Sequence, residues 1–132
     1  MKKYFFLISI LTVIFASSSC RKDGTAVCKA GQGGNTTLLV FPQHHGRAIT
    51  GATAYIAYGT LTSPGSLSSY NLTVAGEPEE EHIHVENMNC GDYFIFCQGY
   101  DSTISQVVRG GIPLTVSPLQ TGEIDVIVPV TE

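Results

Sequence analysis

The sequence predicts an all-β fold, a sandwich of about seven or eight short strands over residues 36–132. Three observations favour this fold. Apolar and β-branched residues occur in short runs, several of which alternate with polar residues. Clusters of Gly, Pro, Asn and Ser separate these runs at intervals of about 8–15 residues. No stretch shows the 3.6-residue period of an amphipathic helix.

The first expected strand covers residues 36–41, and we expect Pro42 to end it because proline cannot donate a ladder hydrogen bond. In residues 82–86, Ile83 and Val85 should lie on one face of a strand and the two histidines on the other. Residues 93–100 are apolar on both faces, which is typical of a central strand. The other expected strands are residues 51–59, 68–74, 104–108, 112–116 and 123–130.

The chain begins with a segment typical of an export signal. Lys2 and Lys3 supply positive charge, residues 4–15 are almost entirely apolar, and residues 16–19 are small and directly precede Cys20. About 12 apolar residues are too few to cross a hydrocarbon core, which needs roughly 20. A positive start, a short apolar centre and a small-residue cleavage site indicate a secretory signal that is removed.

Small residues ending at Cys20 resemble the lipobox of bacterial lipoproteins, in which the signal is cut before a cysteine that then carries the lipid. The resemblance implies a signal peptide over residues 1–19, palmitate-type acyl chains on Cys20, and a place in the bacterial envelope, on either face of the outer membrane. An ordinary secretory signal is the alternative. Residues 20–35 are rich in Gly and polar residues, so we expect a flexible stalk there.

Removal of residues 1–19 leaves five basic and eleven acidic residues, a formal charge of −6. This balance argues against nucleic acid, which requires clustered Lys and Arg, and against a polybasic grip on anionic lipid. Membrane attachment would therefore depend on the acyl chains of Cys20, because stable anchoring needs two hydrophobic signals.

Three cysteines remain once Cys20 is acylated, in a compartment that permits disulfides. Cys90 and Cys97 would lie about 20 Å apart along an extended strand, whereas a disulfide requires Cα atoms within about 7 Å. We prefer a bridge from Cys28 to Cys90, because both lie at the ends of expected elements, with no pairing as the alternative. Cys97 is expected to be a buried, small apolar side chain.

Two segments resemble transthyretin-like sandwiches, including the carboxypeptidase regulatory type. Residues 47–56 resemble their opening of a polar loop, Gly-Ala-x-Val and a strand. Residues 90–100 resemble their Gly-x-Tyr-strand-Gly-Tyr segment, in which the Gly starts the strand and the Tyr packs under the sheet edge. The resemblance implies a prealbumin-like or Ig-like sandwich, mostly found in accessory, adhesive or carrier modules, and it brings no catalytic residues. The whole chain also resembles small Gram-negative lipoproteins.

All four histidines fall in two pairs, His44-His45 and His82-x-His84. On a strand, His82 and His84 project from one face about 7 Å apart, and two imidazoles so placed can bind one zinc or copper ion. The other pair precedes Gly46 in an expected turn. If the pairs meet, they form a metal site with Glu81 or Glu86 as a further donor. The alternative is ordinary loop and edge-strand histidines.

Three other features have simpler interpretations. Residues 77–81 are acidic but lack the spacing and Gly turn of a calcium loop, so we expect a solvated loop beside a strand edge. Ser102, between Asp101 and Thr103, resembles an O-glycosylation acceptor of one group of Gram-negative bacteria. Three tyrosines form either sandwich core, which we prefer, or a surface for glycan or protein: Tyr55, Tyr58 and Tyr70.

Enzyme signatures are missing from the sequence, including the Gly-x-Ser-x-Gly elbow, a phosphate-binding glycine loop and His-Glu-x-x-His. The sequence therefore predicts a non-catalytic envelope lipoprotein without a cofactor, a structural or interaction module whose partner is a protein or a glycan. The alternative is an envelope protein that binds zinc or copper through His44, His45, His82 and His84.

Overall fold

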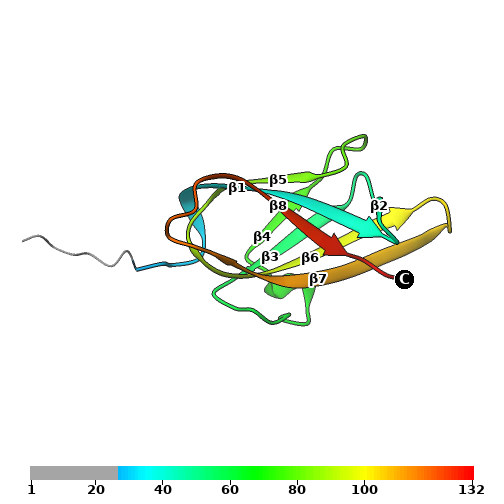
Figure 1. Cartoon of the computed structure of the whole chain (residues 1–132). Helices are drawn as coiled ribbons and strands as arrows, with labels where there is room; N and C mark the ends of the chain where they lie inside the picture. The colour runs from blue at the N-terminus through cyan, green and yellow to red at the C-terminus, as the bar shows by residue number, and fades with distance from the viewer. Residues whose placement is uncertain (1–26) are drawn as a thin grey trace, which may run out of the picture.

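The computed structural model describes residues 27–132, which form two β-sheets packed as a sandwich, so the expected all-β fold is confirmed (Figure 1). The expected signal peptide and Cys20 lie outside these residues. No helix within residues 27–132 has the length and hydropathy of a membrane span. The elements are β1 (Gln32–His44), β2 (Arg47–Ala48), β3 (Thr53–Tyr58), the 3₁₀ turn η1 (Leu67–Ser69), β4 (Leu72–Ala75), β5 (Ile83–Met88), β6 (Gly91–Asp101), β7 (Gln106–Val116) and β8 (Gly122–Pro129).

The first sheet is built around β1, which pairs antiparallel with β5 on one side and parallel with β8 on the other. The short β2 pairs with the end of β1. The second sheet has the order β4-β3-β6-β7 and is antiparallel throughout. If the two-residue β2 is left out of the count, this sheet contains β1, β5 and β8, which are the first, fourth and last of seven strands. This differs from the immunoglobulin constant domain, where the first, second, fourth and fifth do.

The core is formed by the inward-facing residues of both sheets, because alternate side chains of a strand point to opposite faces. Ile83 and Val85 are buried in β5 while His84 between them is exposed, as the alternation predicts. Burial of each such side chain contributes about 1.5–3 kcal/mol. The largest buried side chains include Tyr93, Leu38, Ile56, Met88, Ile95, Val40, Val108 and Val128.

The first strand continues through Pro42, so the expectation that this residue ends it is wrong. The Pro42 carbonyl accepts a hydrogen bond from the Ile49 amide (2.9 Å), whereas the Gln43 carbonyl accepts one from Val130, which follows β8 (2.9 Å). The nitrogen and carbonyl of one strand residue point to the same side, so the Pro42 nitrogen faces away from β8. On that side the pairing with β5 stops at Val40, which lies opposite Ile83, the first residue of β5. The missing N–H therefore removes no bond to β8.

Residues 104–108 and 112–116 were expected as two strands, but β7 is continuous across both Gly110 and Gly111. These glycines allow close packing instead of a turn. A Cβ at Gly110 would collide with the backbone of residues 129–130, and one at Gly111 would lie 2.6 Å from the Phe94 ring. Pro113 is tolerated because β7 is an edge strand. The expected strand over residues 68–74 is also shortened, since η1 occupies its first part.

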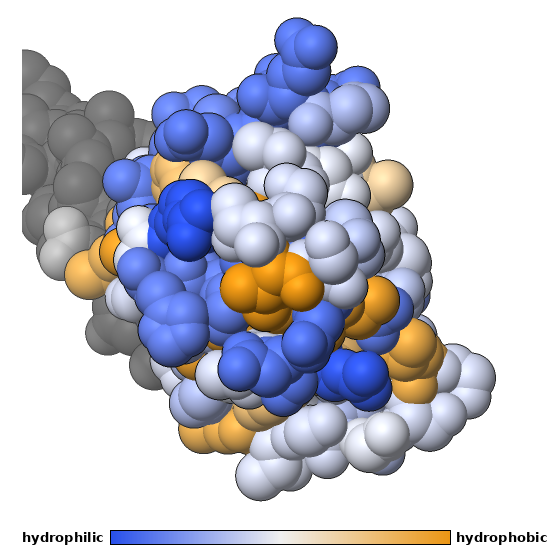
Figure 2. All heavy atoms as spheres, turned by 90° about the vertical axis from the view of Figure 1, so that its right-hand side faces the viewer, coloured by the Kyte–Doolittle hydropathy of each residue, from blue (hydrophilic) through white to orange (hydrophobic). Residues whose placement is uncertain are grey.

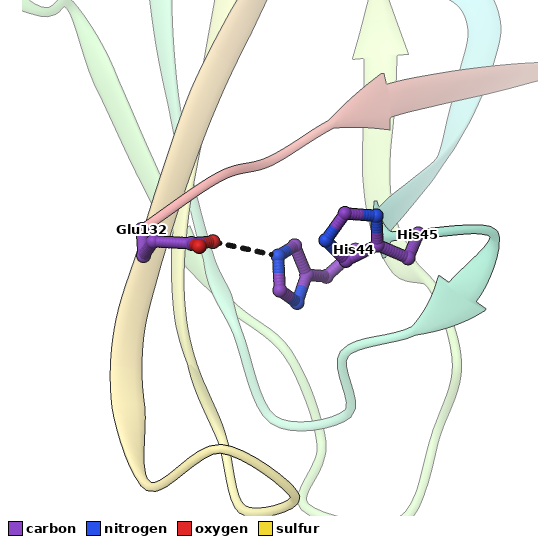
Figure 3. A group of neighbouring side chains, drawn as sticks. All are labelled: His44, His45 and Glu132. Carbon is purple, nitrogen blue, oxygen red and sulfur yellow. Dashed lines mark hydrogen bonds and ion pairs between the residues drawn. The ribbon is translucent and has the colours of Figure 1, made fainter.

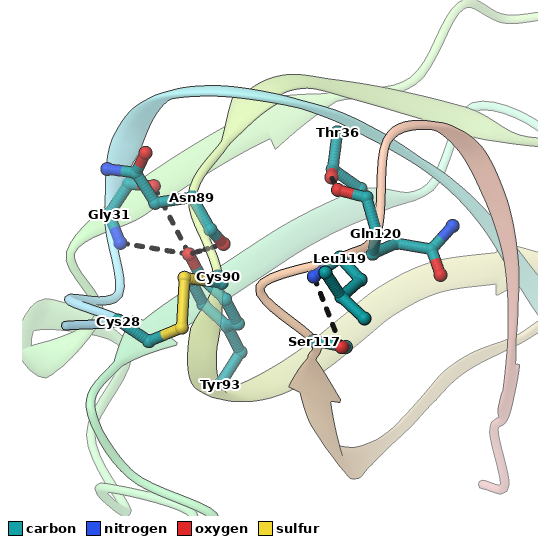
Figure 4. Close-up of a disulfide and its surroundings, with 9 residues drawn as sticks. All are labelled: Cys28, Gly31, Thr36, Asn89, Cys90, Tyr93, Ser117, Leu119 and Gln120. Atoms are coloured by element: carbon teal, nitrogen blue, oxygen red, sulfur yellow. Dashed lines mark hydrogen bonds between the residues drawn. A yellow bond between two sulfur atoms is a disulfide. The ribbon is translucent and has the colours of Figure 1, made fainter. Parts of the chain in front are cut away.

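The end of the expected stalk belongs to the sandwich, since β1 begins at Gln32 instead of residue 36. A disulfide joins Cys28 to Cys90, the pair that the sequence favours (Figure 4). The amide of Gly31 donates to the Tyr93 hydroxyl (2.9 Å), and that hydroxyl donates to the carbonyl of Asn89 (2.7 Å). The glycines that suggest flexibility allow close approach here. A Cβ at Gly34, for example, would collide with the Met88 carbonyl.

Replacing Cys28 and Cys90 together by serine should lower the free energy of unfolding by about 2–4 kcal/mol, because the bond closes a long loop in the unfolded chain. The two residues are separated by 62 positions. Urea denaturation with and without reductant measures the effect. Reduced wild type should match the double variant, and the variant should not respond to reductant. Equal midpoints for the oxidised wild type and the variant would contradict this role.

Candidate functional site

His44 lies on the opposite face of the first sheet from His82 and His84, and His45 lies in the turn after β1, so the expected four-histidine metal site does not form. His44 lies on the inward face of β1 and is buried. His82 and His84 flank the buried Ile83 and lie on the outer face at β5. The cause is the strand alternation, because His44 has the same parity as the buried Val40, which pairs with Ile83.

His44 is held between two carboxylates at the end of the sandwich that also carries the C-terminus. Its Nδ1 lies 2.8 Å from Oδ2 of Asp101, the last residue of β6. Its Nε2 lies 2.9 Å from Oε2 of Glu132, and Figure 3 shows this carboxylate directed at the ring. The His45 ring lies next to it, with the two ring centroids 4.2 Å apart. His44, His45 and Glu132 therefore form one group.

The carboxylates favour the protonated form of His44, in which both ring nitrogens donate. The hydrogen bond with Asp101 raises the pKa of His44 above its ordinary 6.5, against the opposing effect of burial, and Glu132 raises it further. Hydrogen bonds from the Thr103 hydroxyl and from His44 hold the pKa of Asp101 far below its usual range. A hydrogen bond from its own backbone, and then that from His44, lower the pKa of Glu132. The group is an ion-paired network that joins β1, β6 and the C-terminus.

The second group consists of Glu80, His82 and His84, whose ligand atoms all lie within 4.8 Å of one another. The Nε2 atoms of the two histidines are 2.9 Å apart, and Oε2 of Glu80 lies 3.8 Å from Nε2 of His84. The sequence indicated Glu81 or Glu86 as the carboxylate. Glu80 takes this place because a turn precedes the strand, and only the four-residue spacing from Glu80 to His84 could have signalled it.

Three further sequence expectations concern single residues. Cys97 is fully buried in β6, and burial raises the pKa of its thiol to about 12, which agrees with an inert core thiol. Ser102 is exposed in the turn after β6. The neighbouring Asp101 carboxylate is occupied by His44 and Thr103. Ser102 is thus accessible to modification.

The three tyrosines divide between the two faces of the second sheet. Tyr58 packs edge-on against the buried Tyr93, with ring centroids 5.8 Å apart. Tyr55 and Tyr70 instead form a half-buried cluster with Phe96 on the outer face, with ring centroids 5.9–6.1 Å apart. The preferred interpretation as core therefore holds for Tyr58, and the other two form an aromatic surface cluster.

The two histidine groups differ in whether their ring nitrogens are available to bind a proton or a metal ion. Both ring nitrogens of His44 are occupied by carboxylates, so it is not available as a base or ligand unless the network breaks. The Nε2 atoms of His82 and His84 contact each other and face solvent at β5.

Comparisons of the chain with protein-family models, with curated proteins and with solved structures found no match.

The network around His44 should make stability greatest between pH 4.5 and pH 6.5. The contribution of His44, whose pKa is raised on folding, is complete below 6.5 and is lost as the pH rises through its folded value. The contributions of Asp101 and Glu132, whose pKa values are lowered, are complete above 3.8 and 4.5 and are lost as the pH falls. Urea midpoints measured at a series of pH values test this.

The substitution His44→Gln should flatten the basic side of this profile, because glutamine keeps a polar contact but does not titrate. His45→Asn is the matched control, since His45 is exposed at a backbone φ of 50° that asparagine tolerates. A basic side that persists in His44→Gln would show that another group is responsible.

Proposed function

We propose that this chain is a non-catalytic lipoprotein of the bacterial outer membrane, a structural or interaction module anchored through acylated Cys20. The observation that carries the proposal is the attachment of the chain to the sandwich at Cys28, eight residues after that cysteine. Cys28 is fixed to Cys90, and Tyr93 binds the backbone of Gly31. The lipobox-like leader would therefore end beside a folded domain, with only a short tether between them.

The tether would keep one end of the domain close to the membrane. Eight residues from Cys20 to Cys28 span at most about 29 Å, so the disulfide end of the sandwich would face the membrane. The opposite end carries the turn after β1, the turn after β6 and the C-terminus (Figure 1). Figure 2 views this end and shows a mostly hydrophilic surface with separate apolar groups. A partner there, protein or glycan, would meet a polar surface of the kind found in non-obligate complexes.

Two buried side chains of types that often act in catalysis, His44 and Cys97, are in environments that support a non-catalytic role. His44 is buried with both ring nitrogens on carboxylates, so it offers no free nitrogen for general base catalysis. Cys97 is buried, and its pKa of about 12 leaves almost no thiolate for nucleophilic attack.

We also infer a transthyretin-like relationship for the sandwich. In the resembling segment a Gly starts a strand, and Gly91 is the first residue of β6. The Tyr of that segment packs under the sheet edge, and Tyr93 is fully buried with its hydroxyl on the Asn89 carbonyl. Its closing Gly-Tyr corresponds to residues 99–100 at the end of β6. These placements support the inference.

The anchor is tested by labelling cells that express the protein with a palmitate analogue. Wild type should incorporate the label and fractionate with membranes, and Cys20→Ala should incorporate none. Because an uncleaved signal could itself hold the Cys20→Ala protein, a second variant replaces residues 1–19 by an ordinary cleaved secretory signal and also carries Cys20→Ala. This variant should be released in soluble form. Membrane association of this second variant would refute acylation as the anchor, and Cys97→Ala serves as the labelled control.

A further inference from the structure

We propose that Glu80, His82 and His84 form a binding site for a divalent transition-metal ion, an activity beyond tethering. The two imidazole nitrogens and the carboxylate oxygen converge above the outer face of β5, within 4.8 Å of one another. The three side chains face solvent, with His84 and Glu80 each about half exposed, at 45% and 48%. An ion can therefore reach them without any opening of the fold.

The buried residue between the two histidines, the first of β5, holds them in place for binding. Ile83, between them, is buried in the core and pairs with Val40 of β1, so this part of β5 cannot shift without breaking the sheet. The ring of His82 packs against Phe41, with centroids 5.1 Å apart. Ligands fixed in this way lose little side-chain entropy on binding, which strengthens the interaction.

The distance between the two nitrogens suits one shared ion. With metal–nitrogen bonds of about 2.0–2.1 Å, two ligand nitrogens lie about 2.9 Å apart at a right angle and about 3.3 Å apart in a tetrahedron. The observed separation is 2.9 Å. In the free protein this contact is a hydrogen bond in which the Nε2–H of one ring donates to Nε2 of the other. For both Nε2 lone pairs to bind one ion, the donating ring must adopt its other neutral tautomer, with its proton on Nδ1. The Glu80 oxygen, 3.8 Å from His84, needs only a small side-chain movement to join.

The ligand set selects the kind of ion. Imidazole favours copper and zinc, whereas calcium and magnesium require sets of oxygen ligands. Between the two, copper(II) should bind more tightly than zinc(II). Residues 76–89 contain five acidic residues and neither Lys nor Arg, so the local potential attracts a cation. Three protein ligands leave at least one position for water or for a side chain of a partner.

The experiment is a calorimetric titration of the whole chain, purified in detergent without a histidine tag, with copper(II) and zinc(II) separately. We expect one ion per chain and tighter binding of copper. His82→Ala with His84→Ala should weaken binding about 100-fold or more, since loss of even an indirect partner of a metal ligand costs about 10–100-fold. Glu80→Gln should weaken zinc binding by a smaller factor. His45→Asn and Glu79→Gln, which alter residues outside the group, should bind as wild type does.

A second readout needs no substitution of the ligands. Copper(II) is paramagnetic, so substoichiometric copper should broaden the ring NMR signals of His82 and His84 first. Broadening centred on His44 and His45 would overturn the proposal, as would wild-type affinity in the double variant. Absence of copper and zinc binding to the wild type would overturn it as well. The variants change exposed side chains, so their thermal unfolding should match that of wild type and confirm that each is folded.

Discussion

The structure depends on β1, because this one strand connects segments from both ends and the middle of the chain. Leu38 is aligned with Val85 of β5 on one side and with Ile124 of β8 on the other. Since alternate residues face opposite ways, this register sets which side chains of all three strands enter the core. A slip by one residue would bury His84 and expose Val85. The register of β1 therefore decides the core and the outer surface together.

The two ends of the sandwich are closed by different chemistry. At one end a covalent bond and the Tyr93 hydroxyl fasten the incoming chain to the start of β6. At the other end, ion pairs of His44 with Asp101 and Glu132 join β1, the end of β6 and the C-terminus. The backbone of Thr131 also pairs with Arg109 of β7 and so connects the two sheets. A covalent bond can be broken by reductant and ion pairs can be broken by a change of pH, so the two ends should be separable in experiments.

The proposed metal site follows from the same alternation that forms the core. Ile83 anchors β5 inward, and this fixes His84 outward on the strand and His82 outward directly before it. His44 has the opposite fate, since its inward position leaves it paired with carboxylates. Histidines that look equivalent in the sequence thus take two roles, one in closing the fold and one at an accessible surface. If the lipid anchor holds the domain in the envelope, that surface would be open to metal ions there.

The sequence by itself determined the all-β class, the faces of residues 82–86 and the burial of Cys97, because these depend on local alternation and apolar character. It also favoured the bond between Cys28 and Cys90. Only the tertiary structure decided that β1 passes through Pro42, that glycines 110 and 111 lie inside a strand, and that Glu80 joins the two histidines. Each of these depends on which other part of the backbone lies alongside. The pairing of β1 with β5 stops before Pro42, residues 129–130 cross Gly110, and a turn positions Glu80. Such contacts leave no periodic pattern in the sequence, because they are set by pairing between segments far apart in the chain.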